Sequence, residues 1–446
     1  MGKSTPLKNI LKTSVPAVID LSSQTIMFTI EAIFIGRLST AAFAGQGLAI
    51  QVIISFLTIL ITFIVGSSLI IARHLGADET REANHVLGQA LMISIFISFL
   101  FAIFWYFGGV HLFKLIKEGG SVEAQRAGIS YLRIIALFAP IIITNFTAVG
   151  AIRGAGDTHL SMIVNVTING LNLILSPLLI FGWFGFPRWE VEGAALALGI
   201  SHSVGFMVTL YILRTRKSSL FLSFREMTRP NFKTFKRLLK TGVPTTVEQL
   251  VWALGMLVIS IYAAMLGKEY LAVHMVFMRI QGILSMAYLG ISLGAMTLMG
   301  KNLGAEKRRL AERTARTSNW VGFVFSFLIA LFMIAFSKSI LYLFTPEETV
   351  VRLGVSAMIV FAIVQIPKAV DNVIIGNLRG AGDLKWIMYM TIIGVVTLEV
   401  GFSWVVAFVF QLALSGLWSV HLLDESLRLA ANYWRFKGGR WKTMKV

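Results

Sequence analysis

Long blocks of apolar residues, separated by short polar stretches, follow one another along this chain from end to end. Each block holds about twenty or more residues, which is enough for a helix to cross a hydrocarbon core of about 30 Å. Because no water is available in that core, backbone polar groups must pair within the segment. The pattern therefore predicts membrane-spanning helices rather than open sheet.

Twelve such spans are predicted, six in each half of the chain. They cover residues 14–37, 42–72, 87–116, 128–152, 159–182, 192–213, 241–266, 270–299, 317–343, 352–377, 386–409 and 412–434. An even number of crossings returns the chain to the side on which it started. The two halves are therefore expected to share one orientation, related by an axis along the membrane normal.

The two halves also share sequence, which indicates an internal repeat. The segment Arg-Gly-Ala-Gly-Asp occurs at 153–157 and again at 379–383, about half the chain later. At nearly the same offset, Val15-Pro16 matches Val243-Pro244, and 74–77 (His-Leu-Gly-Ala) matches 302–305 (Asn-Leu-Gly-Ala). We predict two homologous six-helix halves, residues 1–222 and 223–446, joined by a basic linker at 214–240.

Composition supports a membrane protein: 56% of the 446 residues are hydrophobic and only 14% are charged, against about a quarter in soluble proteins. The net charge of +18 would indicate a nucleic-acid partner in a soluble chain. Here most Lys and Arg fall on one side of the predicted topology, and the basic linker is expected on anionic headgroups. The positive-inside rule then places both termini in the cytoplasm, with the protein in the plasma or inner membrane and no nucleic acid bound.

Enzymatic chemistry is not indicated by any motif. The sequence has no cysteine, and it shows no Walker motif, metal-ligand cluster or hydrolytic triad. A basic N-terminus runs directly into a full-length span, so no cleavable signal peptide is expected. We predict a non-enzymatic membrane protein without a cofactor or metal centre.

Five carboxylates within the predicted spans are singled out as candidates: Asp20, Glu31, Glu248, Asp371 and Glu399. An ionisable group there costs about 3 kcal/mol on insertion scales and usually marks an ion or substrate pathway. Asp20 and Glu31 project from one face of the first helix, about 16 Å apart along its axis, with Gln24 one turn from Asp20. These three residues predict a polar track that lines a cavity.

Glu31 is the acid set most deeply in apolar sequence. Desolvation favours the neutral form of a carboxyl group, so Glu31 can be neutral in one state and charged in another. A transport-coupling site needs that property. The alternative is a carboxylate held permanently by hydrogen-bond donors.

The other acids have alternative structural interpretations. Asp20 and Glu248 are equivalent in the repeat, and each either couples transport or stabilises the first turns of its helix through the helix dipole. Asp371 corresponds to Asn145 and either couples transport or forms an i,i+3 ion pair with Lys368. For Glu399 the sequence identifies no partner.

Two further sets of side chains are candidates for a site. Asn165, Asn169 and Asn172 form a stripe on the fifth helix, and such amides either link helices or line a hydrated path. A substrate cleft is predicted from aromatic and methionine side chains, which suit flat lipophilic cations. These are Met27, Phe28, Trp252, Met256, Tyr262, Met275, Phe277 and Tyr288. Most of this second set is expected to serve helix packing.

The repeated Arg-Gly-Ala-Gly-Asp segments are predicted to form cytoplasmic turns after the fourth and tenth helices. Glycine permits the tight turn, and the Arg and Asp can pair with other groups or cap helix ends.

Several segments together resemble one family of transporters. They are the Glu31–Leu38 segment with its Gly-Arg-Leu end, both Arg-Gly-Ala-Gly-Asp turns, 271–274 (Leu-Ala-Val-His), 300–305 (Gly-Lys-Asn-Leu-Gly-Ala) and the terminal segment 434–441. Over essentially its whole length the chain resembles a multidrug and toxic compound extrusion (MATE) transporter. This resemblance implies two six-helix lobes around a central cleft, which rock between inward- and outward-open states.

The resemblance also implies export of organic cations in exchange for H⁺ or Na⁺. The family's first-helix acid is commonly Asp, and here it is Glu31. One branch carries a second acid directly before Pro-Leu-Leu-Ile in the fifth helix, where this chain has Ser176. Glu31 would therefore act with Asp20, Gln24 or the asparagine stripe. In another branch the coupling acids lie on helices seven and ten, which here carry Glu248 and Asp371.

We predict a secondary active exporter of amphipathic organic cations that antiports H⁺ or Na⁺, works as a monomer and contacts membrane lipids. The alternative is a flippase for a lipid-linked or polyprenyl substrate, which would need a basic cleft to hold phosphates. A non-transporting scaffold or receptor would not need several buried carboxylates. An acidic site favours cation export, and a basic one favours lipid flipping.

Overall fold

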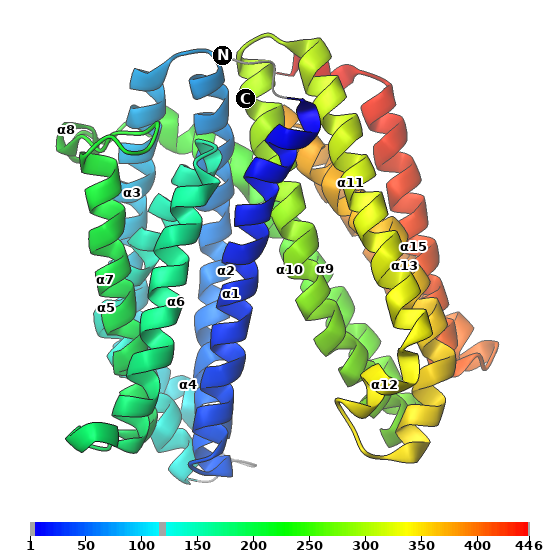
Figure 1. Ribbon diagram of the computed structural model, residues 1–446. Helices are drawn as coiled ribbons and strands as arrows, with labels where there is room; N and C mark the ends of the chain where they lie inside the picture. The colour runs from blue at the N-terminus through cyan, green and yellow to red at the C-terminus, as the bar shows by residue number, and fades with distance from the viewer. Residues whose placement is uncertain (1–4, 116–121, 445–446) are drawn as a thin grey trace. The chain divides into compact units, whose positions relative to one another are not determined.

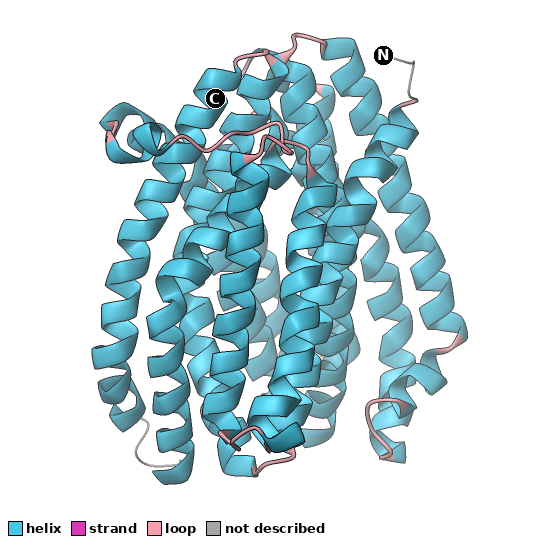
Figure 2. Ribbon diagram, turned by 60° about the vertical axis from the view of Figure 1, so that its left-hand side comes forward, coloured by secondary structure: helices cyan, strands magenta, loops and turns pink. Residues whose placement is uncertain are grey.

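The computed structural model describes residues 5–115 and 122–444, and these residues form helices joined by short connections (Figures 1 and 2). No strand occurs within these two stretches. The first half of the chain contains α1 Pro6–Gly36, α2 Thr40–Gly76, α3 Thr80–Ile103, α4 Gly109–Leu115, α5 Val122–Gly154, α6 Thr158–Phe181, α7 Glu190–Arg214 and α8 Phe224–Thr228. The second half contains α9 Phe232–Leu266, α10 Lys268–Gly304, α11 Arg308–Ala335, α12 Ser337–Tyr342, α13 Glu348–Ala381, α14 Leu384–Gly394 and α15 Ala413–Lys437.

All twelve predicted spans lie on helices, although residue 116, the end of the third span, is outside the described residues. Within those residues, 11 helices are long and apolar enough to cross a membrane. The twelfth span lies on α15, which carries Asp424, Glu425 and Arg428 and is less apolar. The prediction of an all-helical, multi-pass membrane fold is confirmed.

Three short π-helical segments interrupt the regular helices: Phe104–Gly108, Val395–Phe402 and Val405–Val409. The first continues α3 into α4, and the other two continue α14 as far as Val409. A π turn with its i→i+5 bonds is rare and often found at functional sites. Glu399 lies in the second of these segments and is fully buried.

The chain forms two compact units. The N-unit contains Ile19–Gly242, and the C-unit contains Met1–Val18 together with Val243–Val446. The start of α1 thus packs in the C-unit, and residues 223–242 pack in the N-unit. These packing units are distinct from the halves 1–222 and 223–446, which were predicted from the repeat in the sequence. The duplication itself stays a prediction.

One long helix is central to each unit. In the N-unit α5 packs against α2, α3 and α7, and in the C-unit α13 packs against α10, α11 and α15. These two helices end in the repeated Arg-Gly-Ala-Gly-Asp segments, so the repeat places the same sequence at the end of each central helix.

Both glycines of the repeated segment have a structural function. Gly156 and Gly382 have φ of +83° and +92°, respectively, which only glycine adopts without strain. Gly154 and Gly380 lie at close helix crossings. A Cβ at Gly154 would lie 2.5 Å from Ser68 Cα, and one at Gly380 would lie 2.3 Å from the Met296 carbonyl oxygen. The repeat therefore preserves a turn and a close helix contact in each unit.

Replacing Gly154 with Ala is expected to destabilise the protein by about 1–3 kcal/mol, because backbone atoms of α2 would have to move. Gly170→Ala is the matched control, since a Cβ there meets nothing within 4 Å and alanine favours the helix. Thermal unfolding in detergent should show a lower midpoint for the first variant only. Equal midpoints for the two variants would contradict the close crossing.

Candidate functional site: buried carboxylate centres

Asp20 is held by the arginine of the first repeated turn. Arg153 Nε lies 3.0 Å from its Oδ2, and Asn165 Nδ2 donates to its Oδ1 at 2.6 Å. Ser161 Oγ donates to Oδ2 at 3.2 Å. Asp20 therefore joins α1 to α5 and α6.

Glu248 is held in the same way by the second repeated turn. One guanidinium nitrogen of Arg379 lies 2.6 Å and 2.7 Å from the two carboxylate oxygens of Glu248. The helix-dipole interpretation of Asp20 and Glu248 is wrong, because α1 begins at Pro6 and α9 at Phe232, several turns earlier. Each acid is instead the partner of an arginine from the central helix of its unit.

Glu31 is buried, with 1% of its surface exposed. Gln46 Nε2 of α2 donates to Glu31 Oε1 at 2.8 Å, and the Tyr131 hydroxyl of α5 donates to the same oxygen at 3.3 Å. Among the described residues, its second oxygen, Oε2, has no hydrogen-bond partner. No Lys or Arg of the described chain is paired with Glu31. Its negative charge is therefore balanced less than that of Asp20, the other buried acid of α1.

The predicted polar track is divided into separate groups. Asp20 and Glu31 share no hydrogen-bond partner, and half-buried Gln24 makes no side-chain hydrogen bond within the described chain. Asn169 Nδ2 donates to Ser23 Oγ at 2.8 Å, and Asn172 accepts from Ser176 at 3.3 Å. Asn165 and Asn169 thus link α6 to α1.

The C-unit contains a cavity of about 380 Å³, large enough for a small organic molecule. Its wall includes Trp252 of α9, methionines 278 and 286 of α10, and polar side chains of α10 and α13. Six charged residues also line it: Glu248, Lys368, Asp371, Arg379, Glu425 and Arg428.

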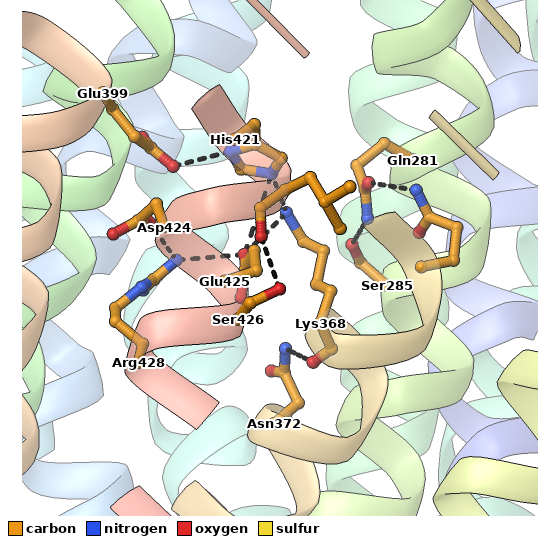
Figure 3. Close-up of polar contacts among 12 residues, drawn as sticks. Gln281, Ser285, Lys368, Asn372, Glu399, His421, Asp424, Glu425, Ser426 and Arg428 are labelled. Carbon is orange, nitrogen blue, oxygen red and sulfur yellow. Dashed lines mark hydrogen bonds and ion pairs between the residues drawn. The ribbon is translucent and has the colours of Figure 1, made fainter. Parts of the chain in front are cut away.

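Asp371 is the lining acid for which no ion pair is found in the described chain; its Oδ1 accepts a hydrogen bond from Asn432 at 2.8 Å. The predicted i,i+3 pair with Lys368 is wrong. Lys368 Nζ instead lies 3.3 Å from Glu425 Oε1 and 3.0 Å from His421 Nε2, because its side chain extends toward α15 (Figure 3).

A chain of polar contacts continues from the cavity wall into the unit (Figure 3). His421 Nδ1 lies 2.7 Å from Glu399 Oε1, which supplies the partner that the sequence did not identify. Arg428 lies 3.0 Å from Glu425 and 2.8 Å from Asp424. Glu399, His421 and Asp424 are not among the residues that line the cavity.

Sequence reasoning missed the α15 members of this network, which are His421, Asp424, Glu425 and Arg428. They were within the predicted span 412–434, so an ionisable cluster inside an apolar segment was the available signal. The cavity wall carries three acids and three Lys or Arg side chains. Glu399 and Asp424 behind the wall raise the number of acids to five. The wall is therefore balanced in charge, and the layer behind it is acidic.

One group of side chains in the described chain has the spacing of metal ligands: donor atoms of Glu399, His421 and Asp424 lie within 4.8 Å of one another. Both nitrogens of His421 are already in hydrogen bonds, with Glu399 and with Lys368. The ring therefore has no free lone pair for a metal ion.

The predicted cleft residues fall into different environments. Trp252 lines the cavity. Met27, Met256, Phe277 and Tyr288 are buried in packing, while Phe28 and Met275 are exposed at 39% and 47%. Tyr262 is half-buried and donates a hydrogen bond to the Val400 carbonyl at 3.1 Å.

The fold and the buried charges define a multi-pass membrane protein of the transporter class. The MatE family model matches residues 16–178 and 244–405. The chain belongs to the MatE family, whose members are transporters and not enzymes.

Two curated relatives are similar over nearly the whole chain. The probable multidrug resistance protein NorM of Thermotoga maritima is 26% identical over 441 residues, covering 98% of this chain and 94% of the relative. The uncharacterized transporter YisQ of Bacillus subtilis is 25% identical over 450 residues, covering 98% and 97%.

Solved structures share the fold. A crystal structure of MATE in complex with MaL6 has a TM-score of 0.90 at 24% identity, covering 99% of this chain and 98% of that one. A MOP superfamily transporter from Pyrococcus furiosus, described as having a binding pocket of reverse polarity, has a TM-score of 0.89 at 24% identity with the same coverage.

Removing one partner of the Glu248–Arg379 pair is expected to destabilise the C-unit by about 3–5 kcal/mol, because the other charge stays buried. Arg379→Met should therefore unfold at lower temperature, and Arg379→Met combined with Glu248→Gln should recover part of the loss. Thermal unfolding of the single and double variants measures this. Additive losses would show that the pair does not interact.

Proposed function

We propose that the protein is a secondary active exporter of amphipathic, mostly cationic organic compounds, which antiports H⁺ or Na⁺ by alternating access of two lobes. The observation that carries this proposal is Glu31, a buried carboxylate with one oxygen free of hydrogen bonds in the described chain. An unpaired carboxylate in a membrane helix favours binding of a proton or a cation.

Ion binding at Glu31 would change the relative stability of two conformations, provided that the ion binds one of them more tightly. The amide of Gln46 and the hydroxyl of Tyr131 hold the carboxylate in one orientation. Both groups are neutral, so they do not replace the ion as a counter-charge.

The C-unit cavity supports a cationic substrate. Two further acids, Glu399 and Asp424, lie behind its wall. Asp371 lines the cavity, and its hydrogen-bond partner among the described residues is the neutral amide of Asn432. Trp252 offers an aromatic face, and methionines 278 and 286 offer adaptable apolar contacts. A flippase for lipid-linked phosphates would need a basic site, so we favour cation export. The names of curated relatives, probable multidrug resistance proteins, agree with export of drugs.

We infer that the protein works as a monomer in the plasma or inner membrane. The concentration of Lys and Arg on one side of the predicted topology supports a cytoplasmic position for both termini.

Glu31→Gln is expected to abolish gradient-driven efflux of ethidium from proteoliposomes, since the amide cannot bind a proton or neutralise a cation. Separate pH and Na⁺ gradients identify the coupling ion in the wild type. Glu192→Gln, at an exposed position of α7, is the matched control and should transport normally. Unaltered efflux by a folded Glu31→Gln protein would exclude the coupling role.

Asp371→Asn is expected to weaken ethidium binding to the detergent-solubilised protein about tenfold, equivalent to about 1.4 kcal/mol. The carboxylate would no longer compensate the cation, while the amide keeps the shape of the cavity. Fluorescence titration measures the dissociation constant, with the exposed Glu348→Gln as a control. An unchanged constant would show that the cation does not bind beside Asp371.

A further inference from the structure

The pair of carboxylates behind the cavity wall is unusual for a membrane interior. Glu399 and Asp424 are both fully buried, and their oxygens lie within 4.8 Å of one another. Within the described chain, Glu399 Oε2 has no hydrogen-bond partner. Two ionised carboxylates so close together repel each other, and binding of one proton relieves that repulsion.

Two glycines make room for this pair. A Cβ at Gly255 of α9 would lie 3.2 Å from Glu399 Oε2, and one at Gly394 would lie 2.2 Å from Asp424 Oδ1. The carboxylates therefore lie against bare backbone instead of hydrogen-bond donors from these two helix segments.

The charged groups around the pair do not balance it. Facing it are His421, Glu425 and Arg428 from α15 and Lys368 from α13. Beyond them, Asp371 interacts with Arg428 and Glu425, and His274 with His421. Glu399, Asp424 and Glu425 thus oppose two basic side chains, Lys368 and Arg428. His274 is bonded to Ser260 through Nε2 at 3.0 Å. The local charge deficit favours uptake of a positive charge.

His421 connects the pair to the cavity. The ammonium group of Lys368 can only donate, so His421 Nε2 accepts from it and the imidazole proton is on Nδ1. That proton is donated to Glu399 Oε1 at 2.7 Å. A second proton on the His421 ring would be repelled by the charge of Lys368. An added proton is therefore more stable on a carboxylate of the pair than on the ring.

We propose that Glu399 and Asp424 form a proton-binding site in the C-unit, loaded from the cavity through Lys368 and His421. In this step the His421 Nδ1 proton passes to Glu399 Oε1, Lys368 passes one proton to His421 Nε2, and Lys368 then takes one proton from the cavity. The net result is transfer of one proton from the cavity to Glu399, with every atom accounted for.

A proton in this site and an organic cation in the cavity each add one positive charge to the same region. Each therefore weakens the binding of the other, and the coupling is reciprocal. This part of the proposal rests on the proposed antiport of cations, whereas the existence of the proton site does not.

Infrared spectroscopy of the full-length protein in detergent tests the site without transport. A carbonyl band of protonated buried carboxyl groups should appear as pH falls. Its Glu399 component should be missing in Glu399→Gln and kept in Glu31→Gln and in the exposed control Glu348→Gln. A spectrum unchanged by Glu399→Gln would overturn the site. Transport by Glu31→Gln would overturn the proposed function and leave this result intact.

Proton transfer through Lys368 and His421 has its own test. In His421→Gln both carboxylates are kept, and exchange of the carboxyl proton with D₂O should slow. Unchanged exchange would overturn this transfer path.

The mutual weakening of proton and cation binding is tested by the pH dependence of ethidium binding. Ethidium affinity in the wild type should rise with pH, by up to about tenfold per pH unit for one linked proton. Glu399→Gln should flatten that dependence.

If Glu399→Gln does not fold, Asp424→Asn provides the same comparison, because it also removes one member of the pair. The thermal unfolding midpoint, measured with and without Na⁺, Mn²⁺ or Zn²⁺, tests whether a metal cation occupies the site instead of a proton. A stabilisation that requires Glu399 would assign the site to a metal cation and overturn the proton assignment.

Discussion

The ion pair between the arginine of each repeated turn and the acid of the first helix in its half is the interaction on which both units depend. Neither charge can be left alone in a medium without water. Arg153–Asp20 and Arg379–Glu248 therefore tie the end of a central helix to the helix that begins each half. With these acids neutralised, the buried carboxylates that lack such a partner are the ones available for ions and substrates.

Features that depend on local sequence could be predicted. The length of the apolar runs predicted the twelve helices, and the repeat predicted equivalent turns. The partners of the acids could not be predicted, because they depend on how each helix is rotated about its axis. Glu31 meets Gln46 and Tyr131 from two other helices, and Lys368 extends toward α15 instead of along its own helix to Asp371.

The charges of α15 show where hydrophobicity alone misleads. A helix that faces lipid must be apolar, but one enclosed by other helices can carry paired charges. Asp424, Glu425 and Arg428 are all buried, and they bond to one another and to α13. The most polar span is thus part of the candidate site. In contrast, Met27, Phe277 and Tyr288 resemble ligand contacts in sequence but serve packing.

The two π-helical segments after α14 have a consequence for the symmetry of the molecule. The span Leu384–Val409 has 26 residues, whereas its repeat counterpart α6, Thr158–Phe181, has 24. Since a π turn accommodates more residues than an α turn, the longer helix absorbs its extra residues without unfolding. The two helices start in register at their repeated turns and end out of register. Glu399 lies within the first of these two π segments, where the regular correspondence between the two helices is lost.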